Sequence, residues 1–466
     1  MSLSSSATSF RRTATKGISI PPRRLTVALL ATLALTVALR TAPVHGEALL
    51  VTHDQAARHG LERAWFAQVP VDTSRSRVTQ WFLYFDRLYS VTNSGIVTAL
   101  DAETGQKVWS KQVGKPGYPA FGPSANADHL GVVSGSKLYL LNRHDGRLEW
   151  MRQLGSAPSS GPALSEEYAF VAMVTGRVEG YDLDDPKTQP WYYQSKGRTY
   201  LRPTTTGNVV SWPTSEGYLY VSRADDPGVL YRLETSADIV TSPAEMAPNL
   251  YIASLDGYLY CLNELNGQEQ WRYSTGYSID SSPAIVGNQA YVASIEPAIH
   301  ALNAKTGKEL WMTAGASHFA AQGKERVYAS DRFGNLLVLD AKTGNPVSRM
   351  AVGEGLSTLV NDQTDRVFLV NDRGLVQCLR EIGAEQPTLY RKPPAPAGAE
   401  EAPPAPGSEA AVNPFDEGEA PATEPAADEP SPFEAEDGAA ADEAPEDAAA
   451  DAPADAPADE ENPFGF

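Results

Sequence analysis

The 466-residue sequence contains only two cysteines, Cys261 and Cys378. Exported proteins that depend on disulfides usually carry several cysteine pairs, so this fold must be stabilised by core packing. The sequence also lacks a nucleophile elbow, a phosphate-binding loop and a histidine-based metal motif. We therefore predict no catalytic, cofactor-binding or metal-binding residues.

The sequence has no excess of positive charge beyond the N-terminus. The formal net charge is −20, and residues 392–466 contain 21 acidic residues and one lysine. Residues 47–391 carry 31 basic and 37 acidic residues, so this part of the chain is close to neutral. Because a nucleic-acid-binding surface needs an excess of basic residues, we expect no nucleic-acid partner.

An apolar run, LTVALLATLALTVAL, covers residues 25–39 and follows a basic segment. It is short for a membrane span but suits the core of a signal peptide. Val44 and Gly46 are small enough for a cleavage site. We therefore expect residues 1–46 to be a signal peptide cleaved near Gly46, and the mature chain to be exported to the periplasm or cell envelope. An uncleaved anchor is the alternative.

Two unrelated residue types recur with a period close to 40 residues. The Trp that follows a Thr-Gly-type turn recurs at intervals of 41, 41, 80 and 40 residues, and Tyr231 lies midway in the long interval. A series of prolines has intervals of 39, 41, 40 and 40 residues. The prolines are Pro123, Pro162, Pro203, Pro243 and Pro283. This shared period indicates internal repeats.

Each repeat has the pattern of a small antiparallel sheet. Residues 250–274, LYIASLDGYLYCLNELNGQEQWRYS, show three short alternating strands separated by Asp-Gly and Asn-Gly turns. Four strands in 40 residues is the size of a propeller blade. Eight second strands begin at Leu88, Leu130, Ala169, Val209, Leu250, Ala290, Val327 and Val367. We predict an all-β fold, an eight-bladed β-propeller over residues 47–391, and a monomer.

The eighth repeat has no Trp in register. Residues 64–71, AWFAQVPV, resemble outer-strand segments such as VWSKQVGK. We predict that this N-terminal strand completes the eighth blade, which would leave no unpaired central edge. Residues 386–391 are the competing candidate.

The repeated Trp is predicted to be structural. In the turn before Trp109, Asp101 and Thr104 can bond to turn amides, and Gly105 can adopt positive φ. The Trp then projects from the outer strand towards the next blade. We assign a blade-docking role to Trp65, Trp109, Trp150, Trp191, Trp271 and Trp311.

The combination of AxDAxTGxxxW with hxxSxxGxhhAL resembles the PQQ-type, or quinoprotein-like, propeller repeat over about residues 60–391. Blade 4 departs from it with ADDPGVLYR, and blade 7 has Ser348 at the Trp position. One branch of this family, the quinoprotein alcohol dehydrogenases, holds PQQ and calcium on the propeller axis, beside an adjacent pair of cysteines. Here Cys261 and Cys378 are single and three blades apart, so they are read as small buried residues.

The other branch is similar to the propeller subunit of the outer-membrane β-barrel assembly machinery. That resemblance implies a non-enzymatic protein-interaction scaffold of the bacterial cell envelope, with envelope proteins as partners. No lipidation cysteine follows the apolar run, so membrane association is expected to be indirect at most. A PQQ-dependent dehydrogenase-like enzyme and a ligand-sensing propeller that uses its central channel remain the alternatives.

Loops that join blades form the mouth of a propeller and are candidates for docking. On position alone, the candidate partner-binding residues are Tyr118, Phe121, Arg202, Asp280, His318 and Phe333. His318 lies in the segment that joins blades 6 and 7, where an ordinary loop residue is the simpler interpretation.

Residues 392–466 consist mainly of Ala, Pro, Glu and Asp and are expected to be disordered. Three Pro-Phe motifs, NPFDEG, SPFEAED and NPFGF, recur in this acidic tail. Repeated motifs on a flexible chain could bind a partner by avidity. The candidate residues are Asn413, Pro414, Phe415, Pro432, Phe433, Asn462, Pro463, Phe464 and Phe466. A solvating acidic spacer is the alternative.

Overall fold

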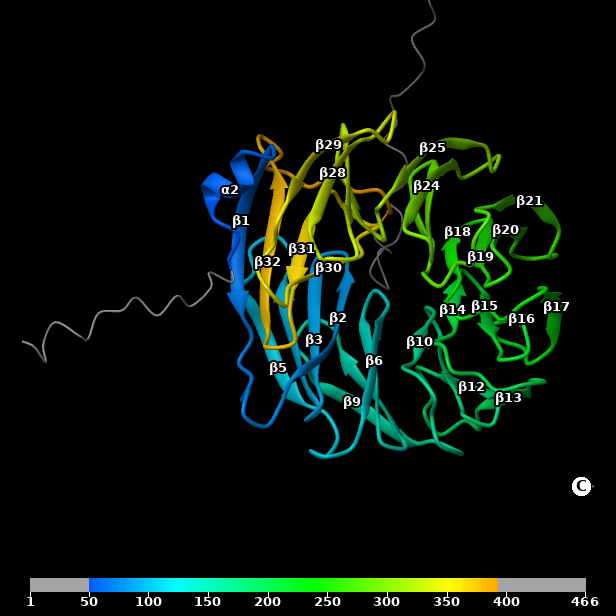
Figure 1. Ribbon diagram of the computed structural model, residues 1–466. Helices are drawn as coiled ribbons and strands as arrows, with labels where there is room; N and C mark the ends of the chain where they lie inside the picture. The colour runs from blue at the N-terminus through cyan, green and yellow to red at the C-terminus, as the bar shows by residue number, and fades with distance from the viewer. Residues whose placement is uncertain (1–49, 393–466) are drawn as a thin grey trace, which may run out of the picture. The chain divides into compact units, whose positions relative to one another are not determined.

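The computed structural model describes residues 50–392, and within them it shows eight four-stranded antiparallel sheets arranged around a central axis (Figure 1). The predicted eight-bladed β-propeller is confirmed. The expected signal peptide and all the Pro-Phe motifs of the tail lie outside the described residues. The one helix in the described range is short, α2 (His53–Ala57), and precedes the first strand.

Blades 1 to 4 follow one another along the chain. Blade 1 contains β2 (Val78–Tyr84), β3 (Arg87–Thr92), β4 (Ile96–Asp101) and β5 (Lys107–Gln112). Blade 2 contains β6 (Ala120–Ala125), β7 (His129–Ser134), β8 (Lys137–Asn142) and β9 (Leu148–Gln153). Blade 3 contains β10 (Ala163–Leu164), β11 (Tyr168–Ala172), β12 (Arg177–Asp182) and β13 (Trp191–Gln194). Blade 4 contains β14 (Thr204–Thr206), β15 (Val209–Pro213), β16 (Tyr218–Arg223) and β17 (Val229–Glu234).

Blades 5 to 8 complete the ring. Blade 5 contains β18 (Ala244–Met246), β19 (Asn249–Ala253), β20 (Tyr258–Asn263) and β21 (Glu269–Ser274). Blade 6 contains β22 (Ala284–Val286), β23 (Gln289–Ser294), β24 (Ala298–Asn303) and β25 (Glu309–Ala314). Blade 7 contains β26 (His318–Gln322), β27 (Arg326–Ser330), β28 (Leu336–Asp340) and β29 (Pro346–Met350). Blade 8 contains β30 (Ser357–Leu359), β31 (Val367–Val370), β32 (Leu375–Glu381) and β1 (Leu61–Gln68).

The meander places two kinds of connection on each face of the ring. The first strand of each blade is innermost, and the first strands of neighbouring blades contact one another along much of the ring. Because successive strands are antiparallel, successive connections lie on opposite faces of the ring. The links between blades and the turns between second and third strands therefore share one face. In blade 2, for example, the Gly135 amide in such a turn donates to the Pro119 carbonyl of the blade link at 2.9 Å. We call this the connection face, and the opposite one the turn face.

The hydrophobic core lies between the blades. Eight clusters of buried residues each combine side chains from two neighbouring sheets, one for every junction of the ring. At the first junction, Tyr89 and Ala99 of blade 1 pack with Leu130 and Leu141 of blade 2. Core positions within a blade therefore face a neighbouring blade, which explains why the strands carry long buried stretches rather than one buried face.

The repeated Trp bridges adjacent blades. The Trp109 indole N–H donates to the Arg143 carbonyl at 2.9 Å, and a Cβ on Gly146 would lie 2.6 Å from its ring. Gly146 has a φ of 71°, so the turn needs a glycine for both reasons. Equivalent bonds to the following blade come from Trp65, Trp150, Trp191, Trp271, Trp311 and, through its hydroxyl, Tyr231.

The ring closes through β1. It pairs antiparallel with β32, with Trp65 opposite Cys378, so the N-terminal strand completes blade 8 (Figure 1). Residues 386–391, the competing candidate, do not form the outer strand of blade 8. The β-bridge described for them is an isolated one between Leu389 and Thr364. Since β32 and β1 come from opposite ends of the propeller, blade 8 has no turn joining its third and fourth strands.

That missing turn accounts for the departure in blade 7. A Trp at position 348 would have no turn between the third and fourth strands of blade 8 to pack against. The Ser348 hydroxyl instead lies 2.9 Å from Nδ1 of His59, which follows α2. The N-terminal segment thus fills the junction that a Trp fills elsewhere.

Candidate interaction surface and central channel

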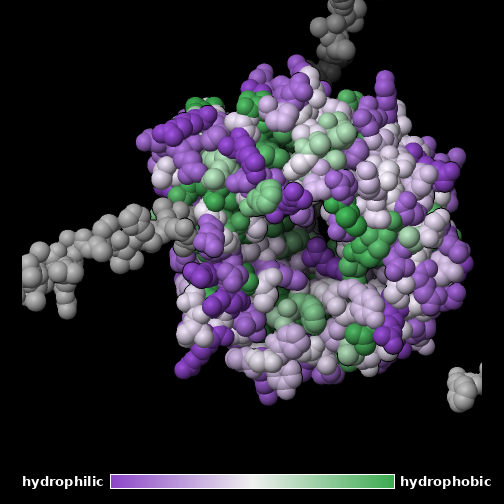
Figure 2. Space-filling view, in the orientation of Figure 1, coloured by the Kyte–Doolittle hydropathy of each residue, from purple (hydrophilic) through white to green (hydrophobic). Residues whose placement is uncertain are grey.

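The connection face carries a set of exposed apolar side chains. All of them lie in blade links or in turns between second and third strands: Tyr118, Val174, Tyr200, Val240, Tyr277, Ile295 and Phe333. A single exposed apolar residue needs no explanation, but a set of them on one face is typical of a protein-binding surface. Figure 2 shows hydrophobic areas around a hollow in the middle of the molecule.

The loop residues singled out from the sequence as docking candidates lie at this face. Tyr118 is in the link between β5 and β6, where its ring packs against Gly135. Phe333, in the β27–β28 turn, is 72% exposed, and the guanidinium groups of Arg332 and Arg349 lie 5.1 and 5.9 Å from its ring centre. Asp280 is exposed in the link between β21 and β22.

Two of the predicted loop residues belong to strands. Phe121 lies in β6, opposite Val133, and packs partly into the core between blades 2 and 3. His318 is the first residue of β26, opposite Ser330, and is exposed. In both blades the innermost strand begins earlier in the sequence than the turn residues predicted. Both residues therefore lie at the connection-face end of a strand that lines the channel.

The innermost strands run from the connection face to the turn face and line two cavities. Gln80–Phe82, early in β2, border a cavity of about 400 Å³, which we call the channel cavity. Tyr84, at the end of the same strand, borders a second cavity of about 270 Å³. The channel cavity is lined by Gln80, Trp81, Phe82, Phe121, Gly122, Pro123, Ser159, Ser160, Gly161, Tyr200, Leu201, Arg202 and Ser242.

Arg202 is the charged residue of the channel cavity. Its Nη1 donates to the Pro123 carbonyl at 2.8 Å, and its guanidinium carbon lies 5.3 Å from the centre of the Phe82 ring. Within residues 50–392, no carboxylate forms an ion pair with it. Burial lowers the pKa of Arg202, although an arginine so far above neutral pH stays charged.

A C-terminal segment, residues 383–392, crosses the turn-face end of the channel; we call it the strap. The Tyr390 hydroxyl donates to the Gln322 carbonyl of blade 7 at 2.9 Å. Arg391 pairs with Asp362 of blade 8 at 2.6 Å and with Glu245 of blade 5. Pro387 and Leu389 of the strap line the second cavity. Sequence reasoning missed this role, because nothing local in the segment indicates what it crosses.

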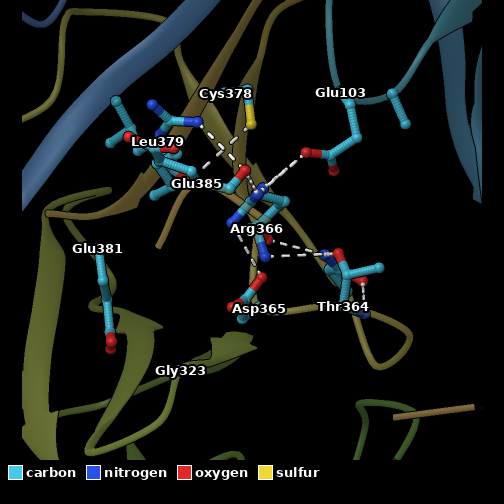
Figure 3. Close-up of polar contacts among 12 residues, drawn as sticks. Glu103, Gly323, Thr364, Asp365, Arg366, Cys378, Leu379, Glu381 and Glu385 are labelled. Carbon is cyan, nitrogen blue, oxygen red and sulfur yellow. Dashed lines mark hydrogen bonds and ion pairs between the residues drawn. The ribbon is translucent and has the colours of Figure 1, made fainter. Parts of the chain in front are cut away.

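A buried arginine joins the strap to the ring closure (Figure 3). Arg366, in the β30–β31 turn, is 1% exposed and donates to the Glu103 carboxylate through Nε and Nη2 at 3.1 and 3.0 Å. It also donates to Asp365 at 3.1 Å and to the Glu385 carbonyl at 3.0 Å. Since two carboxylates compensate its charge, this cluster links blade 8, blade 1 and the strap rather than offering a binding site.

The cysteines do not form a cofactor-facing pair. Both thiols are free and fully buried, Cys261 opposite Trp271 in blade 5 and Cys378 opposite Trp65 in blade 8. Burial raises the pKa of Cys261 to about 12, so its thiol is protonated and unreactive at neutral pH. These residues do not fit the paired-cysteine arrangement of a PQQ site.

Within the described range, no three His, Cys, Asp or Glu side chains are grouped so that they could hold a metal ion. No helix between residues 50 and 392 is long and apolar enough to cross a membrane.

The family follows from comparison with known proteins. A family model described as outer membrane protein assembly factor BamB matches residues 93–249 and 255–345, more than half of the sequence. The chain belongs to this family. BamB of Burkholderia pseudomallei (strain K96243) is 25% identical over 111 residues, which is 24% of this chain and 28% of the relative. The match therefore spans well under two thirds of that relative.

Solved structures share the fold at low sequence identity. BamB from Moraxella catarrhalis has a TM-score of 0.55 and 18% identity, and the match covers 69% of this chain and 97% of that one. The computationally designed Ika8 protein has a TM-score of 0.53 and 16% identity, covering 65% and 96%. The C-terminal WD40 domain of Sif2 has a TM-score of 0.53 and 12% identity, covering 69% and 98%. These likenesses show the propeller fold.

Proposed function

We propose that this protein is a non-enzymatic interaction scaffold of the bacterial cell envelope that takes part in outer-membrane protein assembly. Membership of the BamB family supports the process, and the exposed apolar residues of the connection face support the mode of action. In this proposal the mature chain is periplasmic, and its partners are envelope proteins involved in assembly. It acts as a monomeric propeller without PQQ or calcium.

The connection face carries this proposal, so the test compares it with the rim of the propeller. One variant of the intact chain combines Tyr118→Ser, Tyr277→Ser and Phe333→Ser. Its matched control combines Met151→Ser, Met312→Ser and Val347→Ser, which are similarly exposed on the outer strands β9, β25 and β29. Each protein is crosslinked in envelope extract, and the captured partners are identified by mass spectrometry.

We expect the parent and the rim variant to capture the same envelope assembly protein, and the connection-face variant to lose it. A strain without the protein should also contain less folded outer-membrane protein. Equal capture by both variants would contradict docking through the connection face. Loss of the partner from a chain truncated after Arg391 would instead place recognition in the acidic tail.

Enzyme activity is tested separately. Titration of the purified chain with PQQ and calcium is expected to give no bound-cofactor absorbance and no oxidation of alcohols. Turnover under these conditions would refute the non-enzymatic proposal and favour the dehydrogenase branch.

A further inference from the structure

The channel cavity contains a cation without a counter-ion. Arg202 is the one charged residue in its lining, and a single guanidinium N–H bond, to Pro123, is described. None of its nitrogens is sealed inside the protein without a partner. The N–H groups without a described bond are therefore open to solvent, and because Arg202 lines the channel cavity they can bind both oxygens of a carboxylate that enters it.

The walls around Arg202 suit an aromatic group. Trp81, Phe82, Phe121 and Tyr200 all line the cavity. The hydroxyls of Ser159, Ser160 and Ser242 donate to backbone carbonyls, so they offer acceptor lone pairs rather than further donors. A matching ligand would have a ring, a nearby carboxylate and peptide N–H groups.

The chain itself contains such segments. In the tail, Phe415 is followed directly by Asp416, and Phe433 by Glu434, each ring preceded by a proline. The 21 acidic residues of 392–466 complement the single positive charge in the cavity. Phe433 is 41 residues beyond Lys392, and an extended chain of that length reaches roughly 130 Å, enough to pass from the strap around the rim.

We propose that the channel cavity is a binding site for the Pro-Phe-acid segments of the protein's own tail. Arg202 binds the carboxylate of Asp416 or Glu434, and the preceding phenyl ring packs against Phe82 and Phe121. The tail would enter from the connection face, because the strap crosses the other end of the channel. This inference concerns the cavity and does not depend on the proposed role in assembly.

The test uses the intact chain with and without its own motifs. In the quiet-tail variant, Phe415→Ala, Phe433→Ala and Phe464→Ala remove the three Pro-Phe rings. A fluorescent peptide of residues 411–418 is titrated, and binding is followed by anisotropy. We expect the quiet-tail chain to bind the peptide, and the parent chain to bind it more weakly because its own tail occupies the cavity. Peptides with Phe415→Ala or Asp416→Asn should lose affinity.

Arg202→Gln in the quiet-tail chain should weaken peptide binding by roughly tenfold or more, as expected for loss of a charge-assisted bond. Arg202→Lys keeps the charge but loses the bidentate geometry of the guanidinium group. Its peptide affinity should lie between those of the quiet-tail chain and the Arg202→Gln variant. Arg198→Gln is the matched control, because Arg198 lies on the same blade link, contacts the Tyr200 hydroxyl and does not line the cavity. Melting temperatures of all variants establish that the propeller is folded.

Unchanged affinity in a folded Arg202→Gln variant would overturn the site. Equal affinity of the parent and quiet-tail chains would overturn the tail as its occupant and point to an external peptide. Full displacement by acetate at the same concentration as unlabelled peptide would also overturn it, by showing a simple carboxylate site without recognition of the ring.

Discussion

At the scale of single residues, the repeated Trp has two functions in every blade that carries it and a third in most of them. It fills a junction and donates an indole N–H to the next blade, and at Trp65, Trp109, Trp271 and Trp311 it also covers a glycine with positive φ. Trp271 shows all three, with its bond to the Ala304 carbonyl at 3.1 Å and its ring over Gly307. The spacing in the sequence predicted the positions of the Trp residues. The structure shows which turn of the next blade each of them contacts.

Trp271→Ala should therefore lower the free energy of unfolding by about 3–5 kcal/mol, since it removes a large buried side chain. Phe464→Ala, in the acidic tail, should leave it unchanged. Denaturant titration of both variants measures the difference. Equal midpoints for Trp271→Ala and the parent would refute the docking role.

His300 gives a pH-dependent contribution. It is buried, and its Nδ1 lies 3.0 Å from the Tyr273 hydroxyl of the preceding blade. Burial lowers the pKa of His300 below its usual 6.5, although Glu309 opposes the shift. The unfolded chain then binds more protons, so stability is full above this usual pKa and falls as the pH decreases below it.

We expect His300→Gln to lose less stability than the parent between pH 8 and pH 5, measured by denaturant unfolding at each pH. His144→Gln, at an exposed turn position, is the control and should keep the parent's pH dependence. A parent-like pH dependence in the His300 variant would show that other groups set it.

At the scale of elements, ring closure differs from the other junctions because β1 and β32 come from distant parts of the chain. The outer-strand pattern around Trp65 was sufficient to predict this pairing. From the sequence, Ser348 could be identified only as a departure from the repeat motif. The reason for it, the absence of a turn between the third and fourth strands of blade 8, is visible only in the structure. The Arg366 cluster was not predictable, because Glu103 and Arg366 are 263 residues apart and Glu103 occupies the variable position of the AxDAxTGxxxW motif.

Arg366→Met should destabilise the protein by about 3–5 kcal/mol, because it leaves the carboxylates of Glu103 and Asp365 without their partner. Arg380→Met, which removes a more exposed pair with Glu62, should cost about 1 kcal/mol or less. Thermal unfolding of the two variants separates these expectations. Similar losses of stability in the two variants would mean that burial does not make the Arg366 ion pairs more important than the Arg380 pair.

At the scale of the whole molecule, β1 covers the outer edge of β32, which would otherwise be unpaired in a three-stranded last blade. The eight inter-blade clusters make each blade depend on two neighbours, so an opening at one junction exposes both a strand edge and an apolar surface. An unpaired edge of this kind promotes association between chains.

Deletion of residues 50–68 should therefore produce oligomers or aggregates, detected by light scattering after size-exclusion chromatography. Deletion of residues 393–466, which keeps β1 and the strap, should leave a monomer. A monomeric propeller without β1 would contradict the role of this strand in closing the ring.

The sequence alone determined the repeat period, the number of blades, the turn chemistry, the docking Trp and the strand that closes the ring. These features are encoded locally, because each blade repeats the same alternation of apolar residues and the same turn residues. Only the tertiary structure decided that Arg202 stands alone in a channel, that Arg366 joins the closure and that the strap crosses from blade 8 to blade 5. Those properties depend on which segments, far apart in the sequence, meet around the axis. No local sequence pattern specifies such long-range contacts.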